Sequence, residues 1–532
     1  MGLNLLLVAI VIIVCVVSYK VSNKLGMPML LAFILLGMFF GSDGIVKIRF
    51  DDYVFAEQLC TVALIFIMFY GGFGTKWEEA KPVAIKAILL SSLGTVMTAV
   101  LVGIFCYLIL GMSILESFLL GAVVSSTDAA SVFSILRSKR LNLRYNTASL
   151  LEIESGSNDP FSYMLTIIVL SLMNGSSSFG EFVYLIFCQL VYGGVFGFGL
   201  AIFTVQLLKK FKLNSSGFYS IFILAIALIS YAVPTLLHGN GYLSAYITGI
   251  ILGNSKISDK AELVHFFDGL TGLMQILLFF LLGLLSFPSQ LPSVALTALA
   301  ISLFLAFVAR PVVVFSILTP FRSTMGQKLM VSWAGLRGAA SIVFAIIAII
   351  NPITMNSDIF HIVFFIVLFS ILVQGTLIPF VAKKLKMIDD DIDVMSTFND
   401  YMDELPVQFL QLSIPPEYPW VNEKIRDILL PPDSFLLLIV RGDENIIPNG
   451  ETEIQANDIL ILSGKSPKKI EGISLHEMKI KKETRWHDKK IADVLMGDER
   501  IVLIRRGEGV VIPKGNTVLQ ENDTLVFTEI KQ

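Results

Sequence analysis

Two segments of the chain concentrate oxygen-bearing side chains within sequence that is otherwise apolar. In the first, LLGAVVSSTDAASVFSIL, residues Ser125, Ser126, Thr127 and Asp128 follow one another directly. A charged side chain at the centre of a bilayer costs roughly 3 kcal/mol or more, so an ionisable residue inside a membrane span is a candidate for function. Serine and threonine hydroxyls often bond back to their own helix, but Asp128 has no such local explanation. We therefore interpret Asp128 as part of a binding site.

The second segment, SLLEIESGSNDPFSYMLTIIVL, places several polar side chains around Gly156 and directly before Pro160. Ser155 and Asp159 are four residues apart and share one face of a helix. Pro160 withholds a backbone N–H, which leaves a carbonyl oxygen of the preceding turn without its helical donor. The segment thus combines a carboxylate, hydroxyls and a released carbonyl in one place.

These oxygens suit a small cation. Hard cations bind several oxygen ligands, and a carboxylate that holds either the ion or a proton makes the two compete for one site. Competition at a site exposed alternately to the two faces of a membrane predicts exchange of a cation for a proton, with Asp159 as the exchanging group. In the alternative interpretation, Asp159 only caps a broken helix.

Arg337 lies within a third apolar segment, SWAGLRGAASIVFAII, and an arginine in lipid needs a carboxylate partner. Glu154 and Glu152 are the candidate partners, and a structural ion pair is the favoured role. Arg310, directly before Pro311, receives the same interpretation.

A short string links the first and third segments. TDAASVF at 127–133 recurs approximately as RGAASIVF at 337–344. The two copies lie seven predicted spans apart, so they would cross the membrane in opposite directions, as in transporters built from inverted repeats. Small residues and hydroxyls would allow both helices to unwind and cross near the midplane.

The composition agrees with a membrane protein. Of 532 residues, 55% are hydrophobic and only 16% are charged, whereas soluble domains carry about 25% charged residues. A net charge of -3 argues against a nucleic-acid partner. The four cysteines give no disulfide pattern and no metal-ligand spacing. We expect no cofactor and no metal beyond a transported alkali ion.

Thirteen apolar stretches are long enough to cross the hydrocarbon core of about 30 Å, some with their flanks or as broken helices. Basic clusters flank alternate loops, while the opposite loops hold only Lys47 and Arg49. This bias predicts a multi-pass plasma-membrane protein whose N-terminus is outside and whose C-terminal region is cytoplasmic. The stretches fall at 3–22, 27–42, 56–74, 84–110, 114–137, 146–173, 180–208, 216–237, 241–254, 264–286, 291–319, 327–350 and 359–382.

A soluble region follows the predicted membrane domain, which covers 1–387. An acidic linker (388–405) leads to two similar units (406–470 and 471–532), in which Pro448 and Gly450 of the first correspond to Pro513 and Gly515 of the second. Each unit predicts a short helix and β-strands joined by turns, that is, a small α+β module. The expected fold is an all-α polytopic domain of about thirteen helices with inverted repeats and crossed broken helices, followed by this regulatory region.

The membrane segments resemble the NhaP-like sodium or potassium/proton antiporters. The resemblance rests on SSTDAA, ESGSNDP, GNGYLSAYITGIILGN (239–254) and GLRGAAS. It implies a homodimer of thirteen-helix protomers in membrane lipid, with the fifth and twelfth spans broken and crossed.

The same resemblance implies roles for individual residues. Asp159 would carry the cation or the proton, and Glu154 would pair with Arg337. Asn158 stands where electrogenic relatives have a second aspartate, which implies electroneutral exchange. The implied cation-binding residues are Asp159, Asp128, Thr127, Ser155 and Asn158.

The C-terminal repeat resembles the TrkA-C domain, the ligand-binding lobe of potassium-conductance regulators. No Gly-x-Gly-x-x-Gly unit precedes it between 388 and 420, which argues against regulation by NAD. The resemblance suggests a small anionic regulatory ligand such as cyclic di-AMP; a module serving only dimerisation or stability is the alternative.

Other classes of function fit less well. A ligand-gated cation channel would need a filter of carbonyl or charged rings, and no TVGYG-like loop is present. An ion-coupled solute symporter would need a roomier aromatic or arginine-lined site. No nucleotide-binding loop, zinc motif or nucleophile elbow indicates an enzyme. Oxygen ligands suit both Na⁺ and K⁺, and the TrkA-C resemblance favours K⁺.

Overall fold

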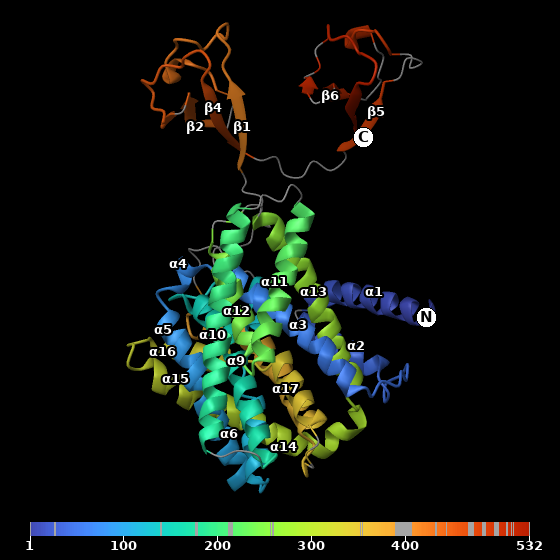
Figure 1. The fold of residues 1–532 in the computed structure, drawn as a ribbon, viewed down its shortest axis with the longest axis vertical. Coiled ribbons are helices and arrows are strands. Elements are labelled where there is room, and N and C mark those ends of the chain that lie inside the picture. Colours follow the sequence, from blue (N-terminus) through green and yellow to red (C-terminus); the bar gives the residue numbers. More distant parts are fainter. Residues whose placement is uncertain are drawn as a thin grey trace. The chain divides into compact units, whose positions relative to one another are not determined.

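The computed structural model divides the chain into two compact units, Met1–Met402 and Asp403–Gln532 (Figure 1). Apart from Ile388, the predicted acidic linker (388–405) lies outside the described residues. The structure describes residues 2–388 and 407–530, except for 26–27, 139–140, 176–178, 211–215, 256, 258–259, 352, 354, 431–433, 443, 466–472, 481–485, 494–499, 507–508, 512 and 514.

In its described part, the first unit consists of helices joined by short non-helical segments. Three π-helical turns interrupt longer helices, an irregularity that is frequent at functional sites: η1 (Leu90–Gly94), η3 (Leu305–Ala309) and η4 (Ser370–Gly375). The α-helices are α1 (Gly2–Leu25), α2 (Met29–Phe40), α3 (Tyr53–Gly74), α4 (Trp77–Ala80), α5 (Ala84–Leu89), α6 (Thr95–Leu108), α7 (Ile114–Val123), α8 (Ala129–Ser138), α9 (Thr147–Met173), α10 (Phe179–Lys210), α11 (Ser216–Leu236), α12 (Gly241–Gly253), α13 (Lys260–Leu285), α14 (Leu291–Phe304), α15 (Arg310–Leu318), α16 (Met325–Trp333), α17 (Ala339–Ile350), α18 (Ile359–Phe369) and α19 (Thr376–Lys384).

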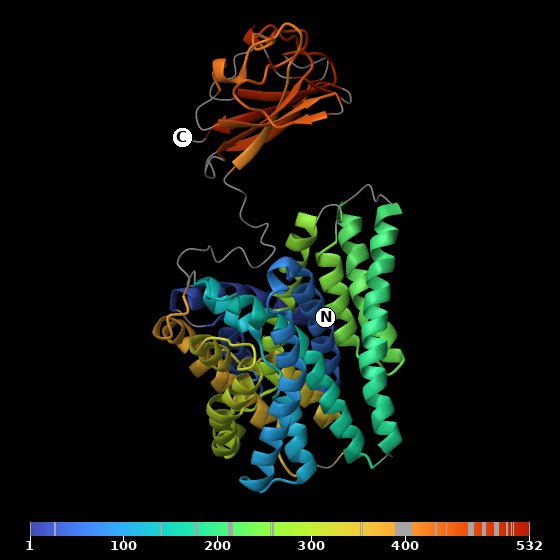
Figure 2. The same ribbon diagram turned by 90° about the vertical axis from the view of Figure 1, so that its left-hand side faces the viewer.

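Every predicted apolar stretch contains helix. Within the described residues, seven helical segments are both long and apolar enough to cross a membrane, and five further apolar helices are 10–17 residues long. The helical membrane domain is therefore confirmed, while the count of thirteen crossings stays a prediction. Figure 2 shows α10 and α11 standing at one edge of this unit, where they pack against α12 and each other.

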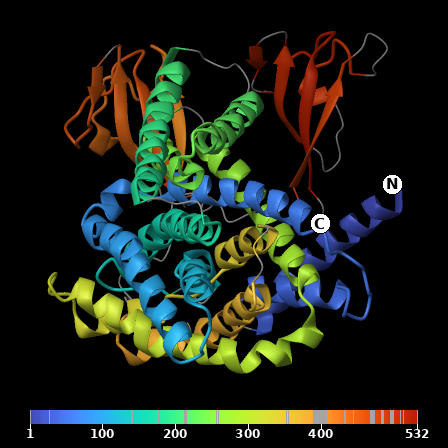
Figure 3. The same ribbon diagram turned by 60° about the horizontal axis from the view of Figure 1, so that its bottom comes forward.

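Two helices are broken where the sequence predicts it. The fifth stretch forms α7 and α8, separated at Val124–Asp128, and the twelfth forms α16 and α17, separated at Ala334–Gly338. The backbone N–H of Asp128 donates to the carbonyl oxygen of Leu336 at 2.8 Å, so the two non-helical segments meet. Figure 3, seen from the end of the bundle, shows α9 and α17 in the middle of the unit, beside each other.

Glycines bring α3 and α12 into backbone contact. A Cβ atom on Gly249 would lie 2.1 Å from the carbonyl oxygen of Phe69, and one on Gly253 would lie 2.0 Å from that of Phe73. Gly72 of α3 approaches Tyr246 of α12 in the same way, at 2.4 Å. Small residues four apart permit such close packing of membrane helices. The closely packed pair of α3 and α12 lies against α9.

The second unit contains two four-stranded antiparallel sheets of identical topology, with strand orders β1-β4-β2-β3 and β5-β8-β6-β7. The short helix predicted in each repeat is a single 3₁₀ turn, Ile425–Asp427 and Ile491–Asp493. The strands that open the modules, β1 and β5, precede the repeated sequence pattern and pair with the last strand of each module. The strands are β1 (Val407–Ser413), β2 (Ser434–Arg441), β3 (Glu444–Ile446), β4 (Ile459–Lys465), β5 (Ile473–Lys479), β6 (Arg500–Arg506), β7 (Gly509–Val511) and β8 (Thr524–Ile530).

Candidate functional site

Asp159 lies in the middle of α9, buried against the break between α7 and α8. Its Oδ1 accepts a hydrogen bond from the hydroxyl of Ser126. Pro160 follows within the same helix and has no N–H, so the carbonyl of Gly156 lacks its usual helical donor. The carboxylate therefore faces polar atoms of the unwound segment in an otherwise apolar core.

Thr127 is tied to α9 at two points. Its carbonyl oxygen accepts a hydrogen bond from the hydroxyl of Ser155 at 2.7 Å, and its own hydroxyl accepts one from the side-chain amide of Asn158 at 2.5 Å. The Oδ1 atom of Asn158 is buried and has no hydrogen-bond partner in the part of the chain that the structure describes. A buried acceptor without a donor is costly, and a cation would satisfy it.

Asp128 contacts the start of α8. Its Oδ2 accepts a hydrogen bond from the hydroxyl of Ser131 at 2.5 Å, and its Oδ1 lies 3.4 Å from the Ser131 N–H. A carboxylate at a helix N-terminus compensates the positive end of the helix dipole. Gly338 leaves room for it, because a Cβ there would lie 2.4 Å from the Cβ of Asp128. These hydrogen bonds make Asp128 a cap at the crossing, and its role as a cation ligand stays a prediction.

The ion pair predicted between Glu154 and Arg337 is wrong. Glu154 instead lies 2.5 Å from Nη2 of Arg310, with both side chains almost completely buried. Arg310 approaches α9 across Gly335, where a Cβ would lie 2.4 Å from its Nε. The pair is a close charge contact without aligned hydrogen bonds. Gly335 is the residue in the sequence that could have indicated this close approach. The sequence does not show, however, that Arg310 would be the side chain that approaches it.

Arg337 binds backbone rather than a carboxylate. Its Nη1 donates to the carbonyl oxygens of Ser125 and Ser126, at 2.9 and 2.6 Å. These carbonyls belong to the non-helical segment directly after α7, beside the negative end of its dipole, so a guanidinium satisfies both the hydrogen bonds and the charge. Arg337 thereby fixes the segment that carries Ser126 and Thr127.

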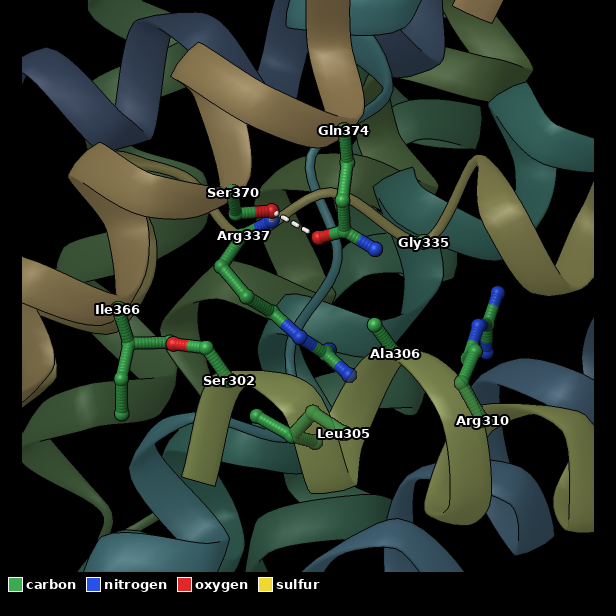
Figure 4. A pocket seen from close by; sticks show the side chains of 9 residues that line it. All are labelled: Ser302, Leu305, Ala306, Arg310, Gly335, Arg337, Ile366, Ser370 and Gln374. Atoms are coloured by element: carbon green, nitrogen blue, oxygen red, sulfur yellow. Dashed lines mark hydrogen bonds between the residues drawn. The ribbon is translucent and has the colours of Figure 1, made fainter. Parts of the chain in front are cut away.

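A small cavity of about 10 Å³, room for one water, lies between the two arginines (Figure 4). Ser370, from the π-helical turn η4, accepts a hydrogen bond from the N–H of Arg337 at 3.0 Å and donates to Oε1 of Gln374 at 2.7 Å. Sequence reasoning missed both of these residues. Hydroxyls and amides in apolar helices are too common to single them out.

The site offers carboxylate, carbonyl, hydroxyl and amide oxygens to a cation. Among the described residues, no group of three or more His, Cys, Asp or Glu side chains is arranged to hold a metal ion. Broken helices that meet beside a buried carboxylate define the class of ion-coupled secondary transporters.

Sequence comparison agrees with this class. Residues 9–384 match the family described as "Sodium/hydrogen exchanger, transmembrane", and residues 409–468 and 475–528 each match the TrkA-C domain. The chain belongs to the sodium/hydrogen exchanger family and carries two TrkA-C domains.

Several curated relatives match most of the chain. It is 32% identical over 465 residues to the K⁺/H⁺ antiporter NhaP of Alkalimonas amylolytica, covering 87% of this chain and 81% of that one. It is 33% identical over 476 residues to the K⁺/H⁺ antiporter NhaP2 of Shewanella baltica, covering 88% of this chain and 81% of that one. The low-affinity Na⁺/H⁺ antiporter NhaS1 of Synechocystis is 26% identical over 408 residues, covering 73% and 75%.

The fold also has a solved counterpart. The sodium proton antiporter MjNhaP1 from Methanocaldococcus jannaschii superposes with a TM-score of 0.64 at 22% identity, covering 72% of this chain and 99% of that one. The similarity confirms the expected fold of the membrane domain.

Proposed function

We propose that this protein exchanges K⁺, Na⁺ or both for H⁺ across the plasma membrane, with cation and proton competing for Asp159. The observation that carries the proposal is the burial of Asp159 beside the unwound segment, where Ser126 donates to it. Thr127, Ser155 and Asn158 lie around the same segment and supply further oxygens. Family membership and the relatives named as antiporters support it.

We infer electroneutral exchange, because Asn158 cannot carry a second proton beside Asp159. Potassium is the preferred cation in this proposal, since the relatives at 32% and 33% identity are named K⁺/H⁺ antiporters. The relative named as a Na⁺/H⁺ antiporter is more distant, at 26% identity.

The proposal includes a homodimer in membrane lipid with the N-terminus outside. The start of α9 and the end of α19 lie at one membrane face, because the N–H of Arg144 donates to the carbonyl oxygen of Met387 at 2.8 Å. Basic residues near this face, including Lys383 and Lys384 of the last turn of α19, favour its assignment as cytoplasmic.

We further propose that the TrkA-C modules regulate exchange by binding a small anionic ligand such as cyclic di-AMP. Isothermal titration of the purified full chain with cyclic di-AMP tests this idea, with ATP as the control anion. Binding heat for the dinucleotide alone supports a regulatory site. Equal or absent heat for both leaves a dimerisation or stability role for the modules.

The main experiment measures proton flux in proteoliposomes with a pH-sensitive dye after addition of K⁺, Na⁺ or Li⁺. The native chain is compared with Asp159→Asn, and with Glu78→Asn as a control at an exposed carboxylate. Loss of exchange only in Asp159→Asn is expected, and undiminished exchange in that variant would refute the mechanism. A rate that changes with an imposed membrane potential would contradict electroneutrality.

A further inference from the structure

A hydrogen-bonded series of polar side chains runs from the start of α3 into the core. The hydroxyl of Thr61 donates to Oε1 of Glu57 at 3.0 Å, and the hydroxyl of Tyr242 donates to Oγ1 of Thr61 at 3.3 Å. Glu57 is partly accessible, whereas Tyr242 is 1% exposed. The series thus connects an accessible carboxylate with a fully buried hydroxyl.

The inner end of this series lies close to the exchange site. The rings of Tyr242 and Tyr163 are 5.1 Å apart, and Tyr163 follows Asp159 by one turn on the same face of α9. Phe344 of α17 lies 5.8 Å from Tyr163 and 6.2 Å from Tyr242. The half-helix that begins at the crossing therefore also borders the polar series.

A purely structural role explains these residues poorly. Apolar side chains would fill the space between α3 and α12 without the cost of burying the hydroxyls of Thr61 and Tyr242. Glycines hold the two helices in backbone contact farther along, so their packing does not depend on Glu57 or Thr61. An ionisable residue facing the interior of a helical membrane domain commonly belongs to an ion path.

We propose that Glu57, Thr61 and Tyr242 line the route by which ions reach Asp159 from the membrane face opposite to the end of α19. The proposal rests on Asp159 as the exchange site. The sidedness follows from α9, which starts at the face where α19 ends and reaches Tyr163 only after passing Asp159. Glu57 attracts the cation or proton, and the two hydroxyls provide oxygen ligands toward the site.

The other end of the same helices provides a matched comparison. The hydroxyl of Thr75, at the end of α3, lies 3.3 Å from Oε1 of Glu152 near the start of α9. The Tyr246 ring packs over Gly156, where a Cβ would lie 2.5 Å from it. A threonine–glutamate pair therefore lies on each side of Asp159: Thr61 with Glu57, and Thr75 with Glu152. The proposed route includes the Thr61–Glu57 pair and not the other.

The test measures the apparent KM for K⁺ or Na⁺ separately at each membrane face, in right-side-out and inside-out vesicles from cells lacking other antiporters. In Glu57→Gln and Thr61→Val we expect KM at the Glu57 face to rise at least fivefold, with KM at the opposite face within twofold of native. Glu57→Asp should restore most of the affinity. Thr75→Val, at the other end, should not raise KM at the Glu57 face.

Equal changes at both faces, or no change in either variant, would overturn the route. Protein yield and melting temperature in detergent show whether a variant folds, and Thr61→Val decides the question if Glu57→Gln does not. Exchange that persists in Asp159→Asn would instead refute the proposed function, so the two failures are distinguishable.

Discussion

The N–H of Asp128 donates to the carbonyl oxygen of Leu336 at 2.8 Å, so the two broken helices are joined backbone to backbone where they cross. Both segments also carry a charge that compensates a helix end. Asp128 caps the start of α8, and Arg337 binds two backbone carbonyls directly beyond the end of α7. The crossing is thus held by the two residues that the sequence marks as charged.

Replacing Arg337 by glutamine should reduce both stability and exchange. The variant leaves the carbonyls of Ser125 and Ser126 without a charged donor, a loss of about 3 kcal/mol for two such bonds. Melting temperature in detergent and dye-reported exchange measure the two effects. Arg337→Lys keeps the charge with fewer donors and should fall between native and Arg337→Gln. Native exchange in Arg337→Gln would show that the bonds do not position the site.

A double-mutant cycle should couple Glu154 with Arg310. Both are buried, so removing either partner leaves an uncompensated charge at a cost of about 3 kcal/mol, while removing both costs less than the sum. Unfolding free energies of Glu154→Gln, Arg310→Gln and the double variant give the coupling. A second cycle, with Glu154→Gln and Arg337→Gln, gives the coupling energy between Glu154 and Arg337 for comparison. Stronger coupling of Glu154 to Arg337 than to Arg310 would contradict the observed pairing.

Gly338→Ala should abolish exchange. The new methyl group would lie 2.4 Å from the Cβ of Asp128, closer than atoms approach, so the crossing has to shift. Gly199→Ala in α10 is the matched control, because its new methyl group meets no atom within 4 Å among the described residues, apart from its chain neighbours and the backbone of its own helix. Exchange assays on both variants, normalised to protein in the membrane, test the expectation. Equal activity of the two would mean that the crossing tolerates a shift.

The TrkA-C modules should lose stability in acid. Burial by itself raises the pKa of Asp458, but the Arg441 guanidinium and the Gln455 N–H outweigh it and hold this pKa below its usual range. Because the folded pKa is the lower one, the stabilisation is fully present above the unfolded pKa of about 4 and is lost as the pH falls through the folded pKa. Hydrogen exchange of β4 in the full chain, corrected for its intrinsic pH dependence, measures the loss.

A substitution separates this ion pair from general acid effects. Asp458→Asn should cost the first module about 3 kcal/mol at neutral pH and flatten its dependence on pH, while the second module keeps its own Asp523–Arg506 pair. Asp427→Asn, in an exposed contact with Arg426, should have little effect. An unchanged pH dependence in Asp458→Asn would rule out the pair as its origin.

The sequence predicts the parts of this site that depend on local pattern. Asp159 before a proline and Asp128 within hydroxyls stand out because charges are rare in apolar stretches, and both lie at the crossing. The partner of Arg337 could not be predicted, because its choice depends on how α9, α15 and the two breaks pack against each other. Ser370 and Gln374 were missed for the same reason.

The C-terminal region shows the same limit. The repeated motif marks β2, β4, β6 and β8, whereas β1 and β5 lie before the repeat and have no distinctive pattern. Their pairing with β4 and β8 is set by contacts distant in sequence. The strands β1 and β5 could therefore be identified only from the structure, where they pair with β4 and β8.

The glycine contacts between α3 and α12 have a mechanical consequence. Two helices whose backbones touch through Gly72, Gly249 and Gly253 have no side-chain layer in which to slide or rotate. We therefore expect α3 and α12 to move together as one rigid body. In the mechanism proposed above, the displacement that exposes Asp159 to each membrane face would occur along the surface that this helix pair shares with α9, where Tyr242 contacts Tyr163 and Tyr246 packs over Gly156.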